Sequence, residues 1–167
     1  KLEEIKGFTL PEIINWNQYG VVFDLPAAYL EIILKINEPI QYYQLRHLLV
    51  FIIFFIGAIN FYTILYNRFE DKLVSLLGFL LLILTPRIFG DSFWNNKDII
   101  FLSFYLISIN FYFKFINIPT NQNLILFGLF SAISTSMRAA GIFLPLSFLL
   151  FYLFDFFSKN REIKIKY

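Results

Sequence analysis

The stretch LLVFIIFFIGAINFYTILY occupies residues 48–66 and contains no charged side chain. Its length is close to the ~20 residues that an α-helix needs to cross the hydrocarbon core of a bilayer. Arg46 and His47 come directly before it, at the boundary between a mixed first segment, residues 1–47, and a hydrophobic remainder, residues 48–167. The stretch therefore predicts a transmembrane helix, preceded by an outer-loop segment and followed by the rest of a membrane bundle.

Composition points to the same fold class over the whole chain. Hydrophobic residues make up 58% of it and aromatic residues 21%, whereas charged residues make up only 16%. Soluble domains have roughly 25% charged residues. A soluble domain of this size buries only about 70% of the surface that its unfolded chain exposes, so the rest would have to be covered by polar residues that this chain has in short supply. The expected fold is all-α, a polytopic transmembrane helical bundle.

Further apolar segments follow the first span. They occupy residues 73–84, 99–116, 124–136 and 141–157. Met137-Arg138-Ala139-Ala140 separates the last two. A single helix through this point would hold Arg138 near the middle of the membrane, at a cost of roughly 2.5–3.5 kcal/mol. We therefore predict a hairpin there, and about five helical segments in the bundle.

Alternation of the spans predicts which connecting segments share a side of the membrane. Residues 1–47, 86–98 and 137–140 fall on one side, and residues 67–72, 117–123 and the C-terminal tail fall on the other. The positive-inside rule marks the second side as cytoplasmic, because it carries Arg68, Lys72, Lys159, Arg161, Lys164 and Lys166. The first side is then the outer face, which is periplasmic in a bacterial inner membrane.

Residues 24–36 have the pattern of an amphipathic helix. Asp24 stands where an N-terminal cap is expected, and Glu31 and Lys35 have the spacing of an i,i+4 ion pair. The apolar face of this helix would consist of Leu25, Ala28, Tyr29, Ile32, Ile33 and Ile36. Two placements are open: the helix packs against the bundle, or it lies in the membrane interface and borders a substrate groove.

Polar residues are densest in residues 86–98, PRIFGDSFWNNKD, between two predicted spans. Arg87 and Lys97 could bind a phosphate at the membrane face, Arg87 as a two-pronged donor and Lys97 as a compact charge. Asp91 and Asn95 could orient sugar hydroxyls or these cations. The alternative interpretation is a solvated loop whose cations extend to lipid headgroups.

Several segments together resemble a known family: YYQLRHLL at 42–49, PRIFGDSFWNNKDI at 86–99 and GLFSAISTSMRAAGIFLPL at 128–146. They are similar to segments of bacterial membrane glycosyltransferases of the C-type superfamily that are related to the protein O-mannosyltransferases. More distantly, they resemble the aminoarabinose transferases that act on lipid A. Relatives carry His where this chain has Asp91, and Pro where it has Asn96.

The resemblance implies an enzyme that moves a hexose or pentose from a polyprenyl-phosphate carrier to an acceptor lipid, glycan or protein at the outer face. It implies no cofactor, and no metal-binding residue is assigned. The residues that it implies for substrate binding are Arg87, Lys97 and Arg138 on the carrier phosphate, Asp98 on Lys97 or the sugar, and Arg46, His47, Asp91 and Asn95 around them.

The family's general base is a carboxylate in the first outer loop, and we expect it upstream of Lys1. Glu12 and Asp24 lie in the segment that is present, but the cap interpretation accounts better for Asp24. Because the chain begins with Lys1 rather than Met, and stops shortly after a hydrophobic stretch, we expect it to be part of a longer protein.

Other function classes have less support. A transporter or flippase of lipid-linked cargo is the alternative, since it too would place cations at membrane depth, and a structural membrane subunit is a third possibility. The absence of Cys excludes a disulfide framework. A net charge of only +2, without a dense basic run, argues against nucleic-acid binding.

Overall fold

The computed structural model describes residues 21–158, and these residues are helical with no strand among them. The elements are α2 (Asp24–Ile33), α3 (Pro39–Phe69), α4 (Lys72–Leu84), α5 (Pro86–Asp91), α6 (Asp98–Asn117), α7 (Asn121–Met137), the 3-10 helix η2 (Ala139–Ile142) and α8 (Phe143–Ser158). Both α3 and α6 are long and apolar enough to cross a membrane. The prediction of an all-α membrane protein is confirmed.

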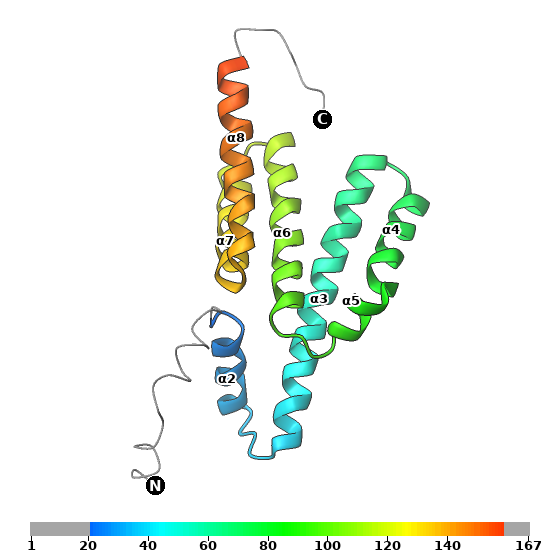
Figure 1. Cartoon of the computed structure of the whole chain (residues 1–167), viewed down its shortest axis with the longest axis vertical. Helices are drawn as coiled ribbons and strands as arrows, with labels where there is room; N and C mark the ends of the chain where they lie inside the picture. Colours follow the sequence, from blue (N-terminus) through cyan, green and yellow to red (C-terminus); the bar gives the residue numbers. More distant parts are fainter. Residues whose placement is uncertain (1–20, 159–167) are drawn as a thin grey trace.

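Helix α3 begins earlier than its uncharged stretch indicates. Pro39 opens it, as proline does well at the first position of a helix, and Glu70 closes it in the left-handed conformation with φ 54°. Arg46 and His47 therefore lie inside this helix, seven and eight residues after its start. With 31 residues, α3 is about 46 Å long, so its first turns extend past α4 and α6 and lie beside α2 (Figure 1).

Helix α4 returns from the far end of α3. The Asp71 side chain accepts hydrogen bonds from the backbone N–H of Leu73 at 2.7 Å and of Val74 at 3.1 Å, which caps the helix. With 13 residues, α4 covers only about 20 Å. It ends at Leu84, and α5 starts at Pro86 after a change of direction.

The predicted hairpin after α7 is present. Arg138 has extended backbone angles, φ −146° and ψ 134°, which end α7 before η2 and α8 begin. At Gly141, a Cβ would press into the backbone of Ser134 and Thr135, so the tight return requires glycine here. The helical run is thus broken at Arg138, whose side chain contacts Asp98 at the start of α6.

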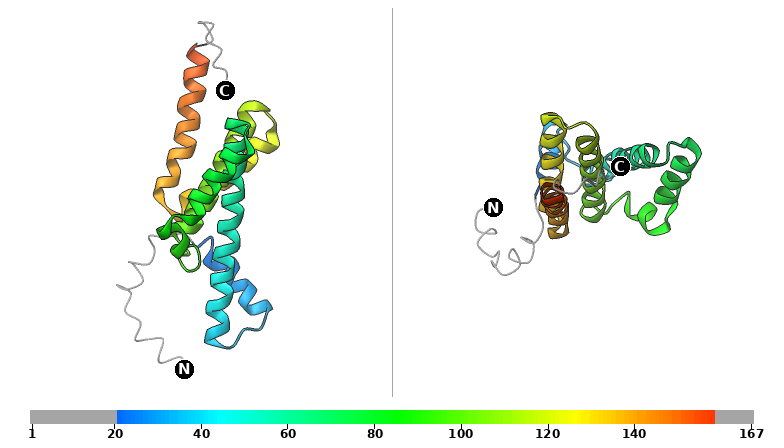
Figure 2. Two further views of the ribbon diagram at one scale, coloured as in Figure 1. Left: turned by 90° about the vertical axis from the view of Figure 1, so that its right-hand side faces the viewer. Right: turned by 90° about the horizontal axis from the view of Figure 1, so that it is seen from above.

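Seen from above, the helices stand in a row that runs from α7 and α8 through α6 and α3 to α4 (Figure 2). The chain passes up and down along this row. The connections α4–α6 and α7–α8 therefore lie at the end of the bundle nearer to α2, and the connections α3–α4 and α6–α7 lie at the opposite end (Figure 1). The connecting segments group as the alternation of spans predicts.

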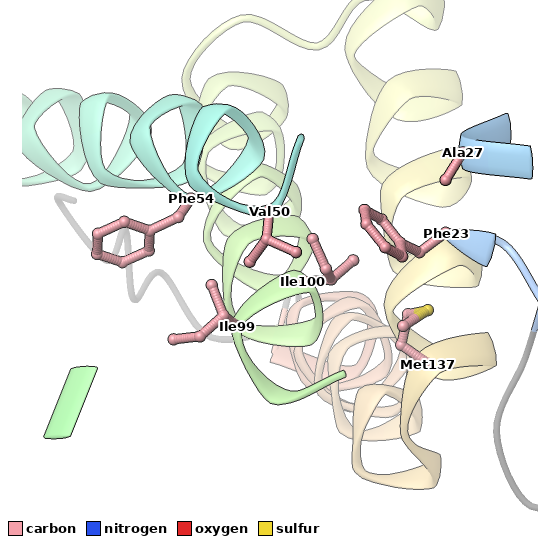
Figure 3. Packing of buried hydrophobic residues seen from close by; sticks show 7 residues of the cluster. All are labelled: Phe23, Ala27, Val50, Phe54, Ile99, Ile100 and Met137. Atoms are coloured by element: carbon pink, nitrogen blue, oxygen red, sulfur yellow. The ribbon is translucent and has the colours of Figure 1, made fainter. Parts of the chain in front are cut away.

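A small core joins α2 to the row of helices. It consists of Phe23, Ala27, Val50, Phe54, Ile99, Ile100 and Met137. Figure 3 shows Phe23 beside Ile100 and Met137, while Val50 and Phe54 approach Ile99 from α3. Since Ile99 and Ile100 follow Asp98, and Met137 precedes Arg138, this core lies directly under the polar end of the bundle.

Helix α2 occupies the predicted region but presents the opposite face to the bundle. Ala27 is buried, whereas the predicted apolar face is open, with Leu25 63%, Tyr29 64% and Ile32 73% exposed. Asp24 makes no cap, because Phe23 is the capping residue and the helix has no side-chain cap bond. Two interactions were predicted within the helix, the Asp24 cap and a Glu31–Lys35 pair. In the structure, Asp24 and Glu31 both bond to Arg46 of α3 instead.

Two asparagines join α3 and α6 within the bundle. The Asn110 amide donates a 2.6 Å hydrogen bond to Asn60 Oδ1, and Asn110 is only 2% exposed. We expect Asn60→Ala and Asn110→Ala to be coupled, with an interaction free energy of about 0.6–1.7 kcal/mol, as for other interhelical bonds in membranes. Thermal unfolding of the two single variants and the double variant in detergent measures this term.

Thr63→Val provides the control for this cycle, since the Thr63 hydroxyl bonds only to Ile59 O of its own helix, at 3.0 Å. Its effect should add to that of Asn110→Ala. Additive effects of Asn60→Ala and Asn110→Ala would show instead that the bond contributes nothing to helix association.

Candidate functional site

A cavity of about 570 Å³ opens at the polar end of the bundle, between α5, the start of α6 and the α7–η2 junction. We call it the Arg138 cavity. It is lined by Arg87, Ile88, Asp91, Asp98, Ile99, Phe101, Leu102 and Arg138. Of the residues predicted to bind substrate, Arg87, Asp91, Asp98 and Arg138 thus lie around one space, although they come from three separate segments.

An ion pair spans this cavity. Arg138 Nη2 contacts Asp98 Oδ1, and both side chains are partly accessible, at 40% and 45% exposure. Asp98 is the first residue of α6, where the positive end of the helix dipole favours a carboxylate. Arg138 lies opposite Asp98, because its own extended backbone ends α7 at this point. A rigid guanidinium is therefore held at the cavity with part of its surface open to solvent.

Arg87 and Asp91 form the outer side of the cavity on α5. Their charged atoms, Nε and Oδ2, are 4.0 Å apart, and the Arg87 side chain is 89% exposed. A pair this long and this accessible contributes little to stability. Arg87 can therefore turn toward an anion in the cavity without breaking a strong bond.

Asn95 shapes the turn between α5 and α6. Its Oδ1 accepts hydrogen bonds from the backbone N–H of Asp98 at 2.9 Å and of Lys97 at 3.2 Å. Its Nδ2 lies 3.4 Å from carboxylate oxygens of both Asp91 and Asp98. Asn95 thus orders the turn before α6 and bridges the two acids, and neither it nor Lys97 lines the cavity.

Arg46 and His47 lie outside the cavity. The Arg46 guanidinium contacts Asp24 and Glu31, each at 2.8 Å, and stacks over the Tyr42 ring at 4.4 Å. His47 is exposed on α3, with its ring centroid 6.5 Å from that of Tyr43. The sequence placed both residues at the mouth of a helix, whereas α3 continues past them.

Apolar residues complete the cavity, and the sequence analysis did not single them out. Phe101 and Leu102 lie three and four positions after Asp98 on α6, so the three side chains share one helix face. This spacing is a signal that could have identified the wall from the sequence. Its consequence is a site that is charged on one side and apolar on the other, at the end of a membrane bundle.

Comparison with protein families gives one match. The model for the family described as dolichyl-phosphate-mannose-protein mannosyltransferase covers residues 26–166. The chain belongs to this mannosyltransferase family. Neither the curated proteins nor the solved structures gave a match. The predicted resemblance is confirmed.

Members of the mannosyltransferase family are glycosyltransferases that depend on a polyprenyl-phosphate-linked sugar. Family membership and the apolar helices together indicate an integral membrane protein. All residues that line the Arg138 cavity fall inside the part matched by the mannosyltransferase family, whereas Phe23 and Asp24 lie just before it. Within residues 21–158, no group of three or more His, Asp or Glu side chains is arranged to hold a metal ion.

Proposed function

We propose that this chain binds the phosphate of a polyprenyl-phosphate-linked sugar in the Arg138 cavity and transfers the sugar to an acceptor lipid, glycan or protein at the outer face of the membrane. The observation that carries the proposal is the meeting of two arginines, two carboxylates and an apolar wall at one end of a membrane bundle. Family membership supplies the donor class.

The charge of the reaction fits these residues. The bond between the sugar C1 and the phosphate oxygen breaks, the bond from the acceptor hydroxyl oxygen to C1 forms, and the leaving phosphate gains negative charge. Arg138 and Arg87 would stabilise that charge, because a guanidinium binds phosphate oxygens in pairs. Asp98 would hold Arg138 in position, whereas Arg87 is free to move from Asp91 toward the phosphate. Lys97, which precedes Asp98 but does not line the cavity, would add a third positive charge near it. The acceptor proton goes to a carboxylate that we do not assign among residues 21–158.

The apolar wall favours a lipid-linked donor over a soluble one. Ile88, Phe101 and Leu102 line the same cavity as the charged residues, so the first isoprene units of a carrier could lie against them while its phosphate contacts the arginines. A nucleotide sugar would place a second phosphate and a polar base on this wall, where neither gains hydrogen bonds.

The proposed sidedness follows from the positive-inside rule as applied to the sequence. We assign the end of the bundle opposite the cavity, which carries Arg68, Lys72 and Lys114, to the cytoplasmic side. The Arg138 cavity then faces outward, toward the periplasm in a bacterial inner membrane. The exposed apolar face of α2 would rest in the lipid interface beside it.

Transfer of labelled sugar tests the proposal. Membranes that contain the protein are supplied with polyprenyl-phosphate-mannose labelled in the sugar, mannose being the first choice because the family description names it. We expect the label to move from the carrier to membrane or envelope acceptors, and we expect no transfer from a nucleotide-linked mannose. Retention of all label on the carrier would reject the proposal.

The same assay separates the alternative function. A transporter or flippase would expose labelled carrier to a mannosidase on the other side of sealed vesicles while the sugar–phosphate bond stays intact. Arg68→Ala serves as the control variant, since it removes a cation at the opposite end of the bundle. Its transfer rate should equal that of the unmodified protein.

A further inference from the structure

Arg46 is the centre of a polar network that does not reach the Arg138 cavity. Its Nη1 lies 2.8 Å from Asp24 Oδ1, and its Nε lies 2.8 Å from Glu31 Oε1. The side chains of Arg46 and Glu31 are only 19% and 13% exposed. A guanidinium of α3 therefore binds both ends of α2, in an environment where charge pairs are screened less than on an open surface.

The network continues into the turn before α6. Asp24 Oδ1, which accepts from Arg46, also lies 3.4 Å from Asn96 Nδ2. Asn96 is two residues before Asp98, in the turn that Asn95 shapes. One carboxylate oxygen thus links α2, α3 and the segment that delivers Asp98 to the cavity. We call Asp24, Glu31, Arg46 and Asn96 the Arg46 bridge.

Apolar packing places the start of α2 beside both partners of the ion pair. Phe23, 4% exposed, lies next to Ile100 and Met137 (Figure 3). Ile100 follows Asp98 by two positions, and Met137 directly precedes Arg138. The first residues of α2 therefore touch the two backbone segments that set the spacing between Asp98 and Arg138.

The apolar attachment of α2 is concentrated at its start. Phe23 and Ala27 are buried and Val22 packs against the same core, whereas Leu25, Tyr29, Ile32 and Ile33 are 56–73% exposed. Without Arg46, the half-buried Asp24 and Glu31 would face each other with no cation between them, which favours separation of α2 from α3. Arg46 is thus the charged attachment of α2 to α3, beside the apolar contacts of Phe23 and Ala27.

We propose that Arg46 is a positioning residue: it holds α2 on the bundle and, through Asp24 and Asn96, fixes the turn that carries Lys97 and Asp98. The turn sets the position of Asp98, and Asp98 in turn sets the position of Arg138 relative to the carrier phosphate. This consequence for the donor rests on the proposed function. Displacements of about 1 Å at such a site can lower rates by up to ~10²-fold.

Trp94 allows the bridge to be observed without any substrate. The chain has two tryptophans, Trp16 and Trp94, so Trp16→Phe leaves only the tryptophan of the turn, two residues before Asn96. In this background, we expect Arg46→Ala to change the quenching of Trp94 fluorescence by acrylamide, because the turn is released. Arg46→Lys should restore the unmodified value only in part, since an ammonium cannot bind both carboxylates as a fork.

Kinetics test the link to the donor. We expect Arg46→Ala to raise the donor KM about tenfold or more, within the range expected for a misplaced binding group, and to change kcat less. Gln44→Ala is the matched control: the residue lies two positions before Arg46 on the same helix, is exposed and is outside the bridge. It should change neither Trp94 quenching nor KM.

The outcomes separate this inference from the proposed function. Unchanged Trp94 quenching in Arg46→Ala overturns the inference, even if transfer falls. A changed quenching with an unaltered KM overturns its link to the donor. Absence of transfer by the unmodified protein rejects the proposed function, and Trp94 still decides whether the bridge exists. If Arg46→Ala fails to accumulate, Asn96→Ala replaces it, because this change cuts only the link to the turn.

Discussion

Arg138→Ala is expected to lower kcat for sugar transfer by about 10²–10³-fold, the usual effect of removing one group that stabilises charge in a transition state. The guanidinium lies in the cavity against Asp98. Its loss removes a phosphate ligand and also leaves the Asp98 carboxylate without its counter-charge, so that a like charge faces the leaving group. Single-turnover transfer at saturating polyprenyl-phosphate-mannose measures this effect apart from donor affinity.

Two further variants show which property of Arg138 matters. Arg138→Lys keeps the charge but loses paired donation, so its rate should lie between those of Arg138→Ala and the unmodified protein. Lys114→Ala removes a cation near the other end of α6, where Lys114 lies 5.0 Å from the Phe111 ring, and should leave the rate unchanged. A rate within twofold of the unmodified protein in Arg138→Ala would exclude a phosphate site in this cavity.

Gly57→Leu is expected to destabilise the bundle by at least about 3 kcal/mol, the upper part of the range for overpacked cores. A Cβ at Gly57 would lie 2.7 Å from Ser103 Cα and 2.9 Å from Ser103 Cβ. The neighbour is helix backbone, so α3 and α6 would have to move apart, as in other membrane helix pairs that meet at small residues. Val50 and Phe54 would then lose their packing against Ile99.

Gly128→Leu on α7 is the matched control for this change. Nothing lies within 4 Å of a Cβ at Gly128, and leucine favours a helix over glycine by about 1 kcal/mol. Its thermal unfolding in detergent should occur at or slightly above the temperature of the unmodified protein. Equal unfolding temperatures for Gly57→Leu and Gly128→Leu would show that α3 and α6 do not meet closely at Gly57.

Most of the fold could be predicted because each membrane helix corresponds to a local run of apolar residues in the sequence. The runs 48–66 and 99–116 became the central parts of α3 and α6, and the interruption at Arg138 became a hairpin. A lipid environment penalises any long departure from helix and any charge at depth, so apolar runs and their breaks carry most of the topology.

Predictions about individual charges were less successful. The i,i+4 rule pairs Glu31 with Lys35, and the capping rule assigns Asp24 to its own helix, but each of these effects contributes only a few tenths to about 1–2 kcal/mol. A half-buried arginine requires counter-charges more strongly than either. Arg46 therefore takes both carboxylates, from residues 15 and 22 positions away.

The candidate site, like the fold, could be predicted from the sequence only in part. The sequence by itself determined the membrane class, the order of helices and the end of the bundle at which Arg87, Asp91, Asp98 and Arg138 gather, because each follows from runs and breaks along one segment. Only the tertiary structure decided that Asp98 pairs with Arg138, that Arg46 joins α2 instead of the cavity, and that Asn95 is used in a turn. Those pairings depend on which charged groups come within a few ångströms of each other once the helices pack. That packing depends on the whole chain and not on any one segment.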